Sequence, residues 1–259
     1  MDVLTNLKDV LRSYGDSKLL GESYGEGPVR VVWLHGWARR GDDFILAASA
    51  LADRGVASVT LDLPGCGASP LPDVAGGARH YAELITPALR EISSEPLVLV
   101  GHSFGGRVAV VVASTHPEVV RALVLSGVPL LRLESPSAPR LSYRIVRWLY
   151  AKGLVSEKRM ETARQKHGSN DYRRAQGVMR QVLVANVNES YEDELANIVA
   201  PVDFVWGEND NVVPLEVATR AASLLKSDHT LRVVAGVGHL LPLEAPEDLV
   251  SAVEKVLHS

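Results

Sequence analysis

The sequence has almost no cysteine: Cys66 is the single one in 259 residues. One cysteine cannot form a disulfide within the chain, and this is typical of reducing compartments, so we expect a cytoplasmic protein. No run of 18 apolar residues occurs, so no membrane-spanning helix is predicted. Residues 1–15 carry Asp2 and lack the apolar core of a signal peptide. Apolar residues recur there at helical spacing and predict an amphipathic helix: Leu4, Leu7, Val10, Leu11 and Tyr14.

The sequence also has no excess of positively charged residues. The chain has 27 Lys and Arg against 31 Asp and Glu, a net charge of −4, so general nucleic-acid binding is not expected. No group of His, Asp and Glu has the spacing of metal ligands, and we predict no metal and no cofactor. Internal repeats and low-complexity tracts are absent. The hydrophobic content of 46% is enough to bury a large core.

Short apolar runs alternate with helical patterns along the chain. The runs are typical of buried parallel strands and lie at residues 29–34, 56–61, 97–100, 122–128, 202–206 and 231–235. The helical patterns lie at residues 42–54, 78–92, 104–115, 215–226 and 246–257. This alternation predicts an α/β fold, with a mostly parallel sheet and helices on both faces. Residues 17–25 predict an antiparallel hairpin at the edge of the sheet.

One interval between predicted strands is too long for a loop. About 70 residues separate the runs at 122–128 and 202–206, and a structureless loop of that length is improbable in a compact domain. The interval opens with a loop that contains three prolines and continues with helical patterns. We therefore predict a helical cap at residues 130–200, inserted into a core formed by residues 1–129 and 201–259.

A serine sits where a predicted strand meets a predicted helix. Ser103 lies in VLVGHSFGG, with Gly101 two places before it and Gly105 two places after it. A sharp turn at this junction strains the serine backbone, crowds both glycine positions and holds the hydroxyl clear of the sheet edge. The start of the following helix favours negative charge. The G-x-S-x-G pattern in this context predicts a nucleophile, and an idle serine in a glycine-rich turn is the alternative.

A serine nucleophile needs a base and an orienting carboxylate, in the chain order Ser, acid, His for this architecture. His239 follows a predicted strand on a glycine-flanked loop and is the predicted base. His229 is expected to be solvated, and His258 lies next to the C-terminus, where chains fray. Asp210, a few residues past another strand, is the predicted acid. Glu208 is its local rival and is expected to be a solvated turn residue.

Two backbone amides are the candidates for stabilising a developing oxyanion. Phe104 follows the nucleophile directly. Trp37 follows Gly36 in the loop after the run at 29–34. We expect His35 to organise this loop by hydrogen bonding, and His102 to be structural.

Apolar residues near the predicted site are candidates for binding an acyl chain. The Trp37 indole would wall the site, and Leu130, Leu131 and Leu240 would form the pocket. Core packing explains these leucines almost as well.

Charge is divided unevenly along the chain. Residues 132–180 contain 12 basic and 4 acidic residues, so they carry +8 and the rest of the chain carries −12. Arg140, Arg144 and Arg147 fall on one face of a predicted helix. This face has three interpretations: a solvated roof over the pocket, a surface for anionic membranes, or a docking site for an anionic acyl carrier such as an acyl carrier protein or coenzyme A.

The motifs together resemble the α/β-hydrolase superfamily, in its single-domain carboxylesterase and lipase-like branch. They are HGW (35–37), LDLPGCGAS (61–69), GHSFGG (101–106), GENDNVVP (207–214) and GVGHLLPLEAP (236–246). The resemblance implies a doubly wound, eight-stranded sheet with a helical cap after the sixth strand. It also implies a triad of Ser103, Asp210 and His239, with the amides of Trp37 and Phe104 as oxyanion donors. Cys66 stands where a bulkier residue is common in the family, and we interpret it as a small filler.

These features predict a serine hydrolase that cleaves a carboxylic ester or thioester through an acyl-enzyme. The HGW loop and the basic cap are similar to pimeloyl-carrier methyl ester esterases, which implies an acyl substrate linked to a carrier. Related dehalogenases and epoxide hydrolases use Asp as nucleophile, and Ser103 excludes them. A carbon–carbon bond hydrolase, a perhydrolase and a ligand-sensing pseudo-hydrolase stay open, because one fold hosts many chemistries.

Overall fold

The computed structural model describes residues 10–16, 18–132, 146, 148–167 and 170–258. Several positions singled out above lie outside these ranges: Leu4, Leu7, Arg140, Arg144 and Arg147. The structure therefore tests neither the predicted helix over residues 1–9 nor the predicted arginine face.

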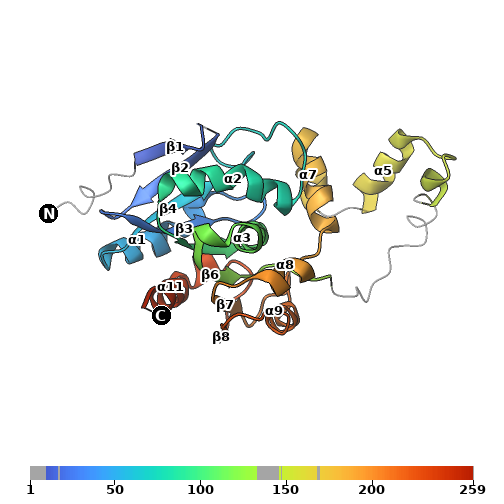
Figure 1. The fold of residues 1–259 in the computed structure, drawn as a ribbon. Helices are drawn as coiled ribbons and strands as arrows, with labels where there is room; N and C mark the ends of the chain where they lie inside the picture. Colours follow the sequence, from blue (N-terminus) through green and yellow to red (C-terminus); the bar gives the residue numbers. More distant parts are fainter. Residues whose placement is uncertain (1–9, 17, 133–145, 147, 168–169, 259) are drawn as a thin grey trace.

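An eight-stranded sheet runs through the centre of the molecule (Figure 1) in the order β1-β2-β4-β3-β5-β6-β7-β8. The pairs β1–β2 and β2–β4 are antiparallel, and all later pairs are parallel. The strands are β1 (Val10–Tyr14), β2 (Leu19–Tyr24), β3 (Val29–Leu34), β4 (Ala57–Asp62), β5 (Leu97–His102), β6 (Val120–Ser126), β7 (Val202–Gly207) and β8 (His229–Val234). This arrangement confirms the predicted α/β fold with its mostly parallel, eight-stranded sheet.

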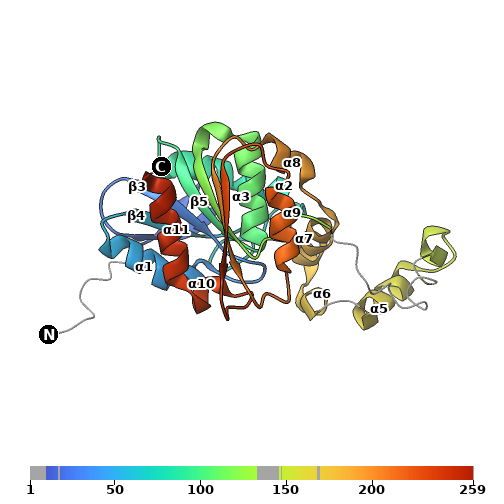
Figure 2. The same cartoon turned by 90° about the horizontal axis from the view of Figure 1, so that it is seen from below.

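Helices cover both faces of the sheet (Figures 1 and 2). One face packs against α1 (Ile45–Asp53), which follows the 3-10 turn η1 (Gly41–Phe44), and against α11 (Pro246–His258). The other face packs against α2 (Ala78–Ile92), α3 (Phe104–Thr115) and α9 (Leu215–Ala222). Two short elements, η2 (Pro117–Val119) and α10 (Leu241–Glu244), complete this part. Strands covered on both sides must be apolar at successive positions, which explains the continuous runs in the sequence.

Helices occupy most of the described part of the chain between β6 and β7, and residues 148–151 are helical as well as the helices named next. These are α5 (Glu157–His167), α6 (Asn170–Arg174), α7 (Gly177–Asn188) and α8 (Glu192–Asn197). In both views α7 and α8 lie beside the body of the molecule, and α5 lies farther out (Figures 1 and 2). The helices fall in the interval where the sequence predicts a helical insertion. The division into core and cap stays a prediction.

The helix predicted near the N-terminus is wrong for residues 10–14, which the structure describes. Val10–Tyr14 is strand β1, not the end of a helix. Gly15 and Asp16 both have positive φ values, +59° and +55°, and reverse the chain. β1 then pairs antiparallel with β2, so the hairpin predicted within residues 17–25 is instead formed by these two strands. Pairing with a neighbouring strand satisfies the backbone groups of β1, and the local helical spacing does not decide the outcome.

Candidate active site

Ser103 occupies a strained turn between β5 and α3. Its φ of +49° and ψ of −113° are rare for a residue with a side chain. Its amide donates to the Ser126 carbonyl at the end of the neighbouring strand β6, 2.9 Å away. The serine therefore sits at the carboxyl edge of the parallel sheet, in the conformation that the sequence predicts.

The glycines around Ser103 allow the backbone to come close to its neighbours. A Cβ on Gly101 would lie 2.4 Å from the Gly106 Cα atom, and one on Gly105 would lie 2.1 Å from the Leu34 carbonyl oxygen. Real Cβ contacts are not this short, so alanine at either position would force the backbone apart. The prediction that both positions exclude bulk is confirmed.

Asp210 and His239 meet at the same edge of the sheet. His239 donates its Nδ1–H to Asp210 Oδ2, with 2.8 Å between the two atoms. The second oxygen of Asp210 accepts the amides of Val212 and Val213 at 2.9 and 2.8 Å. The Asp210 side chain is 1% exposed, and that of His239 is 17% exposed. Burial acts to raise the pKa of Asp210, but the hydrogen bonds from His239 and the two amides prevail, so this pKa lies below its ordinary value.

Glu208, the rival acid, points to a different partner. Its Oε2 accepts the Gly236 amide at 2.9 Å. Glu208 is exposed, whereas Asp210 is buried. The loop after β7 therefore brings only Asp210 of these two into hydrogen-bonding contact with His239.

Gly127 marks the place where these residues converge. It follows Ser126, the residue whose carbonyl binds the Ser103 amide. A Cβ on Gly127 would lie 2.9 Å from the imidazole of His239 and 3.2 Å from Asp210 Oδ2. Glycine suits this position because there is no room for a Cβ atom. Its φ of +58° is also a backbone conformation that glycine adopts readily. The histidine ring thus lies directly against the backbone at the end of β6.

Glu244 is a residue that the sequence analysis missed. Its carboxylate accepts the amides on both sides of His239, from Gly238 at 2.7 Å and from Leu240 at 3.2 Å. It lies in the short helix α10 and holds the loop that carries the histidine. A glutamate shortly after a glycine-flanked histidine is the signal that could have found it.

His102 and His35 are both buried and neutral. His102 donates Nδ1–H to the Ser126 carbonyl at 3.0 Å, and its ring centre lies 4.8 Å from that of His239. Burial, reinforced by the neighbouring His239, lowers the pKa of His102 to about 3. His35 accepts the Leu63 amide at 2.9 Å, and burial lowers its pKa as well. The prediction that His35 organises its loop by hydrogen bonding is confirmed.

The loop after β3 is tied to the start of α3. The Gly105 amide donates to the His35 carbonyl at 3.0 Å. The ring of Trp37 packs edge-on against that of Phe104, with 5.7 Å between ring centres. The two residues predicted to supply oxyanion donors therefore lie side by side.

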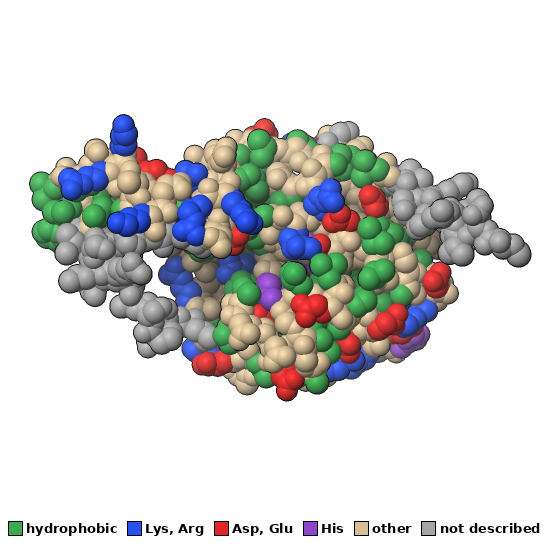
Figure 3. Space-filling model, turned by 180° about the vertical axis from the view of Figure 1, so that it is seen from behind, with side chains coloured by type: hydrophobic (Ala, Val, Ile, Leu, Met, Phe, Trp, Pro, Cys, Tyr) green, Lys and Arg blue, Asp and Glu red, His purple; other side chains and the backbone are tan. Residues whose placement is uncertain are grey.

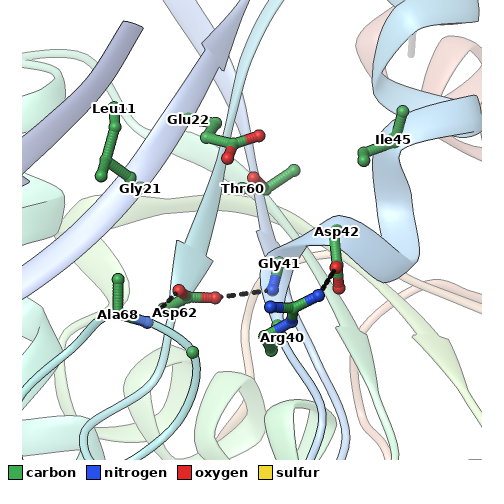
Figure 4. Close-up of a pocket in the computed structure, with 11 residues that line it drawn as sticks. Leu11, Gly21, Glu22, Arg40, Gly41, Asp42, Ile45, Thr60, Asp62 and Ala68 are labelled. Carbon is green, nitrogen blue, oxygen red and sulfur yellow. Dashed lines mark hydrogen bonds and ion pairs between the residues drawn. The ribbon is translucent and has the colours of Figure 1, made fainter. Parts of the chain in front are cut away.

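Asp62 at the end of β4 fastens the other end of the same loop (Figure 4). Its two carboxylate oxygens accept the amides of Gly41 and Ala68, each at 2.8 Å. These residues line a depression of about 410 Å³ between β2, β4 and η1. Asp62 thus joins the loop of residues 35–41 to the loop that follows β4.

The remaining predicted site residues differ in burial. Leu130 and Leu131 are buried in the main core, and Leu240 is half-buried. Cys66 is buried, and this burial, with help from Asp62, raises the pKa of its thiol to about 11. His229 is exposed, as predicted.

A hollow bordered by Lys and Arg side chains and one histidine opens beside the projecting part of the molecule that contains α5 (Figure 3).

Among the described residues, no three His, Cys, Asp or Glu side chains are grouped so that they could hold a metal ion. No helix in the described part of the chain is long and apolar enough to cross a membrane.

Comparison with known proteins identifies a family for the chain. The sequence model of the alpha/beta hydrolase family matches residues 31–253. A 2-hydroxy-6-oxononadienedioate/2-hydroxy-6-oxononatrienedioate hydrolase of Paraburkholderia phymatum is 29% identical over 231 residues, which are 76% of each chain. A pimeloyl-[acyl-carrier protein] methyl ester esterase of Chromobacterium violaceum is 40% identical over 108 residues, 41% of this chain and 39% of that protein. An esterase of Exiguobacterium antarcticum, 20% identical, has the same fold with a TM-score of 0.72 over 96% of this chain and 99% of its own.

Proposed function

The chain belongs to the alpha/beta hydrolase family, and we propose that it is a serine hydrolase that cleaves a carboxylic ester or thioester through an acyl-enzyme. The observation that carries the proposal is the 2.8 Å bond between His239 Nδ1 and Asp210 Oδ2. This pair lies beside Gly127, next to the strained turn of Ser103. Nucleophile, base and acid then come from the ends of β5, β8 and β7.

In this mechanism the Ser103 hydroxyl attacks the acyl carbon while His239 Nε2 takes its proton. Asp210 holds the ring so that Nε2 is the free acceptor, and its charge stabilises the imidazolium that forms. The imidazolium then gives the proton to the departing alcohol or thiol, which leaves the acyl group on Ser103. A water molecule repeats the sequence and releases the acid and the free serine.

The negative charge on the acyl oxygen needs donors that are in place beforehand. The Phe104 amide opens α3, where the helix dipole favours an anion. The Trp37 amide is the second proposed donor. The bond from Gly105 to the His35 carbonyl and the contact between the Trp37 and Phe104 rings support this pairing.

Mass spectrometry of the intact protein tests the proposal directly. We expect a panel of acyl donors to leave an acyl group on Ser103, and Ser103→Ala to abolish both the adduct and ester hydrolysis. Removal of a triad member costs on the order of 10⁴-fold or more in turnover. A folded Ser103→Ala protein that keeps more than about a tenth of the wild-type rate would remove Ser103 from the mechanism.

A second candidate function rests on the relative from Paraburkholderia phymatum. The substrate in its name is a hydroxylated oxo-dicarboxylate without an ester, so hydrolysis there must break a carbon–carbon bond. The same three side chains could serve that reaction. The discriminating assay compares kcat/KM for simple esters and for such a dienedioate. A preference for the dienedioate would replace the ester proposal.

The proposed substrate is carried by an anionic partner, an acyl carrier protein or coenzyme A. The relative from Chromobacterium violaceum is named for an acyl-carrier substrate, and residues 132–180 carry +8. We propose that Arg140, Arg144 and Arg147 dock this carrier. Reversing all three to Glu should sharply lower kcat/KM for a carrier-linked ester, less so at high salt, and spare a small neutral ester. Equal effects on both esters would leave the cap as solubilising surface.

A further inference from the structure

Arg107 is a buried arginine on the helix that begins at the nucleophile. It lies in α3, and its amide donates to the Ser103 carbonyl at 3.3 Å. The residue is 8% exposed. Arginine is seldom buried to this extent unless it is paired.

The guanidinium of Arg107 is bound by uncharged groups. Its Nε donates to the Pro129 carbonyl at 2.8 Å. One terminal nitrogen donates to the Asn186 carbonyl and to the Asn186 side-chain oxygen, both at 2.8 Å. The Tyr191 ring lies 5.7 Å from the guanidinium carbon. Within the described part of the chain, no carboxylate forms an ion pair with it, and burial lowers the pKa of Arg107.

These bonds connect segments that are far apart in the sequence. Pro129 follows β6, and Asn186 lies in the last turn of α7. The rigid fork of arginine can reach both at once, whereas a lysine offers a single nitrogen. A buried charge without a carboxylate partner adds little to stability, so the role of Arg107 is to hold these two segments in a fixed geometry.

The segment after β6 is held from both sides. Gly106 precedes Arg107, and a Cβ there would lie 2.2 Å from a methyl group of Val128, so the missing side chain lets this segment approach α3. On the far side, the Tyr191 amide donates to the Leu130 carbonyl at 3.1 Å. Residues 128–131 thus form a strip clamped between the nucleophile helix and the chain that follows α7.

We infer that Arg107 is a positioning residue for acyl-chain selectivity: it fixes residues 128–131 and the end of α7 relative to Ser103, and so sets the wall against which an acyl chain lies. The inference rests on the proposed function, because it concerns acyl groups held at Ser103. Arg107 touches no reacting atom in this scheme. It acts through Leu130, Leu131 and α7.

The test is a ratio of two rates. We would measure kcat/KM for p-nitrophenyl octanoate and p-nitrophenyl acetate with wild type, Arg107→Lys and Arg107→Met. Loss of a hydrogen bond to a charged group changes the free energy by enough to alter a rate about tenfold. We expect the octanoate-to-acetate ratio to fall about tenfold in both variants, while kcat/KM for acetate changes less than about threefold, because a two-carbon acyl group does not reach the wall.

Arg132→Met is the matched control. The Arg132 side chain also bonds to the end of α7, at the Val187 carbonyl and the Asn188 side chain, both at 3.0 Å, but it is exposed. We expect this variant to keep the wild-type ratio. An equal fall in Arg132→Met would show that any loosening of α7 suffices and would overturn the specific assignment to Arg107.

Hydrogen exchange provides a readout that does not need substrate. Peptides covering residues 128–131 and 177–191 should exchange faster in Arg107→Lys than in wild type. Equal loss of both ester activities would reduce Arg107 to a structural role, and an unchanged ratio despite faster exchange would refute its influence on selectivity. A wild-type protein that hydrolyses neither ester would instead refute the proposed function, and the selectivity inference with it.

Discussion

Replacing Asp210 by asparagine changes the charge of the proposed acid while keeping its shape. Asp210 Oδ1 already accepts the amides of Val212 and Val213, so the asparagine oxygen stays on those donors. Its NH₂ group then faces His239. The ring must offer an unprotonated Nδ1 to this donor, which leaves the proton on Nε2. In that tautomer His239 cannot take the serine proton.

The size of the effect follows from this tautomer. The same change in a serine protease triad lowers kcat about 10⁴-fold, roughly 5 kcal/mol of activation free energy. We expect a fall of about 10³- to 10⁴-fold here. KM should change less than about threefold, because the Asp210 side chain is 1% exposed and lies behind the histidine.

Steady-state hydrolysis of an activated ester, with thermal unfolding of each variant as a check, measures this effect. Glu208→Gln is the matched control, because Glu208 bonds the Gly236 amide and not the histidine. It should keep kcat within about threefold of wild type. A folded Asp210→Asn protein with more than about a tenth of the wild-type kcat, or a control that loses as much, would refute the reasoning.

Three further predictions concern the surroundings of the site. Gly127→Ala should displace the His239 ring, since its Cβ would lie 2.9 Å from that ring; kcat should fall while KM stays, and unchanged kcat would contradict the geometry. Thiol reagents should leave activity intact, because Cys66 is buried and the pKa of its thiol is raised to about 11; inactivation that Cys66→Ala prevents would refute this. The lowered pKa of Asp210 makes its carboxylate stabilising above the ordinary value of 3.8 and less so as the pH falls through the folded value. Urea unfolding should therefore show wild type losing its advantage over Asp210→Asn in acid, and a constant difference would be the contrary result.

The centre of the fold could be predicted because its pattern is local. The strand at 29–34 and the helix at 104–115 have the predicted ends, and the other predicted strands agree within two residues. Strands buried on both faces leave a continuous apolar run that needs no partner to be recognised. β1 was missed because an edge strand depends on pairing with β2, which the spacing of its own residues does not encode.

The sequence was sufficient to predict which loops carry the candidate site residues. It was not sufficient to predict which side chains form hydrogen bonds with one another. Asp210 and Glu208 both follow the same strand, and only the folded loop decides which of them turns toward His239. Arg107 and Asn186 lie 79 residues apart, and no sequence pattern near either residue indicates that they are in contact. Contacts of this kind depend on how helices dock, which one sequence does not reveal.

The position of β8 has a consequence for how activity is lost when the protein unfolds. β8 ends the sheet and pairs with β7 alone among the described strands, and all six of its residues are exposed or half-buried. The loop that carries His239 follows this strand, whereas Ser103 follows the central strand β5. Edge elements open at lower free energy than the interior of a protein. We therefore expect denaturant to abolish activity by releasing His239, the proposed base, while the middle of the sheet is still folded, so that loss of activity precedes loss of structure.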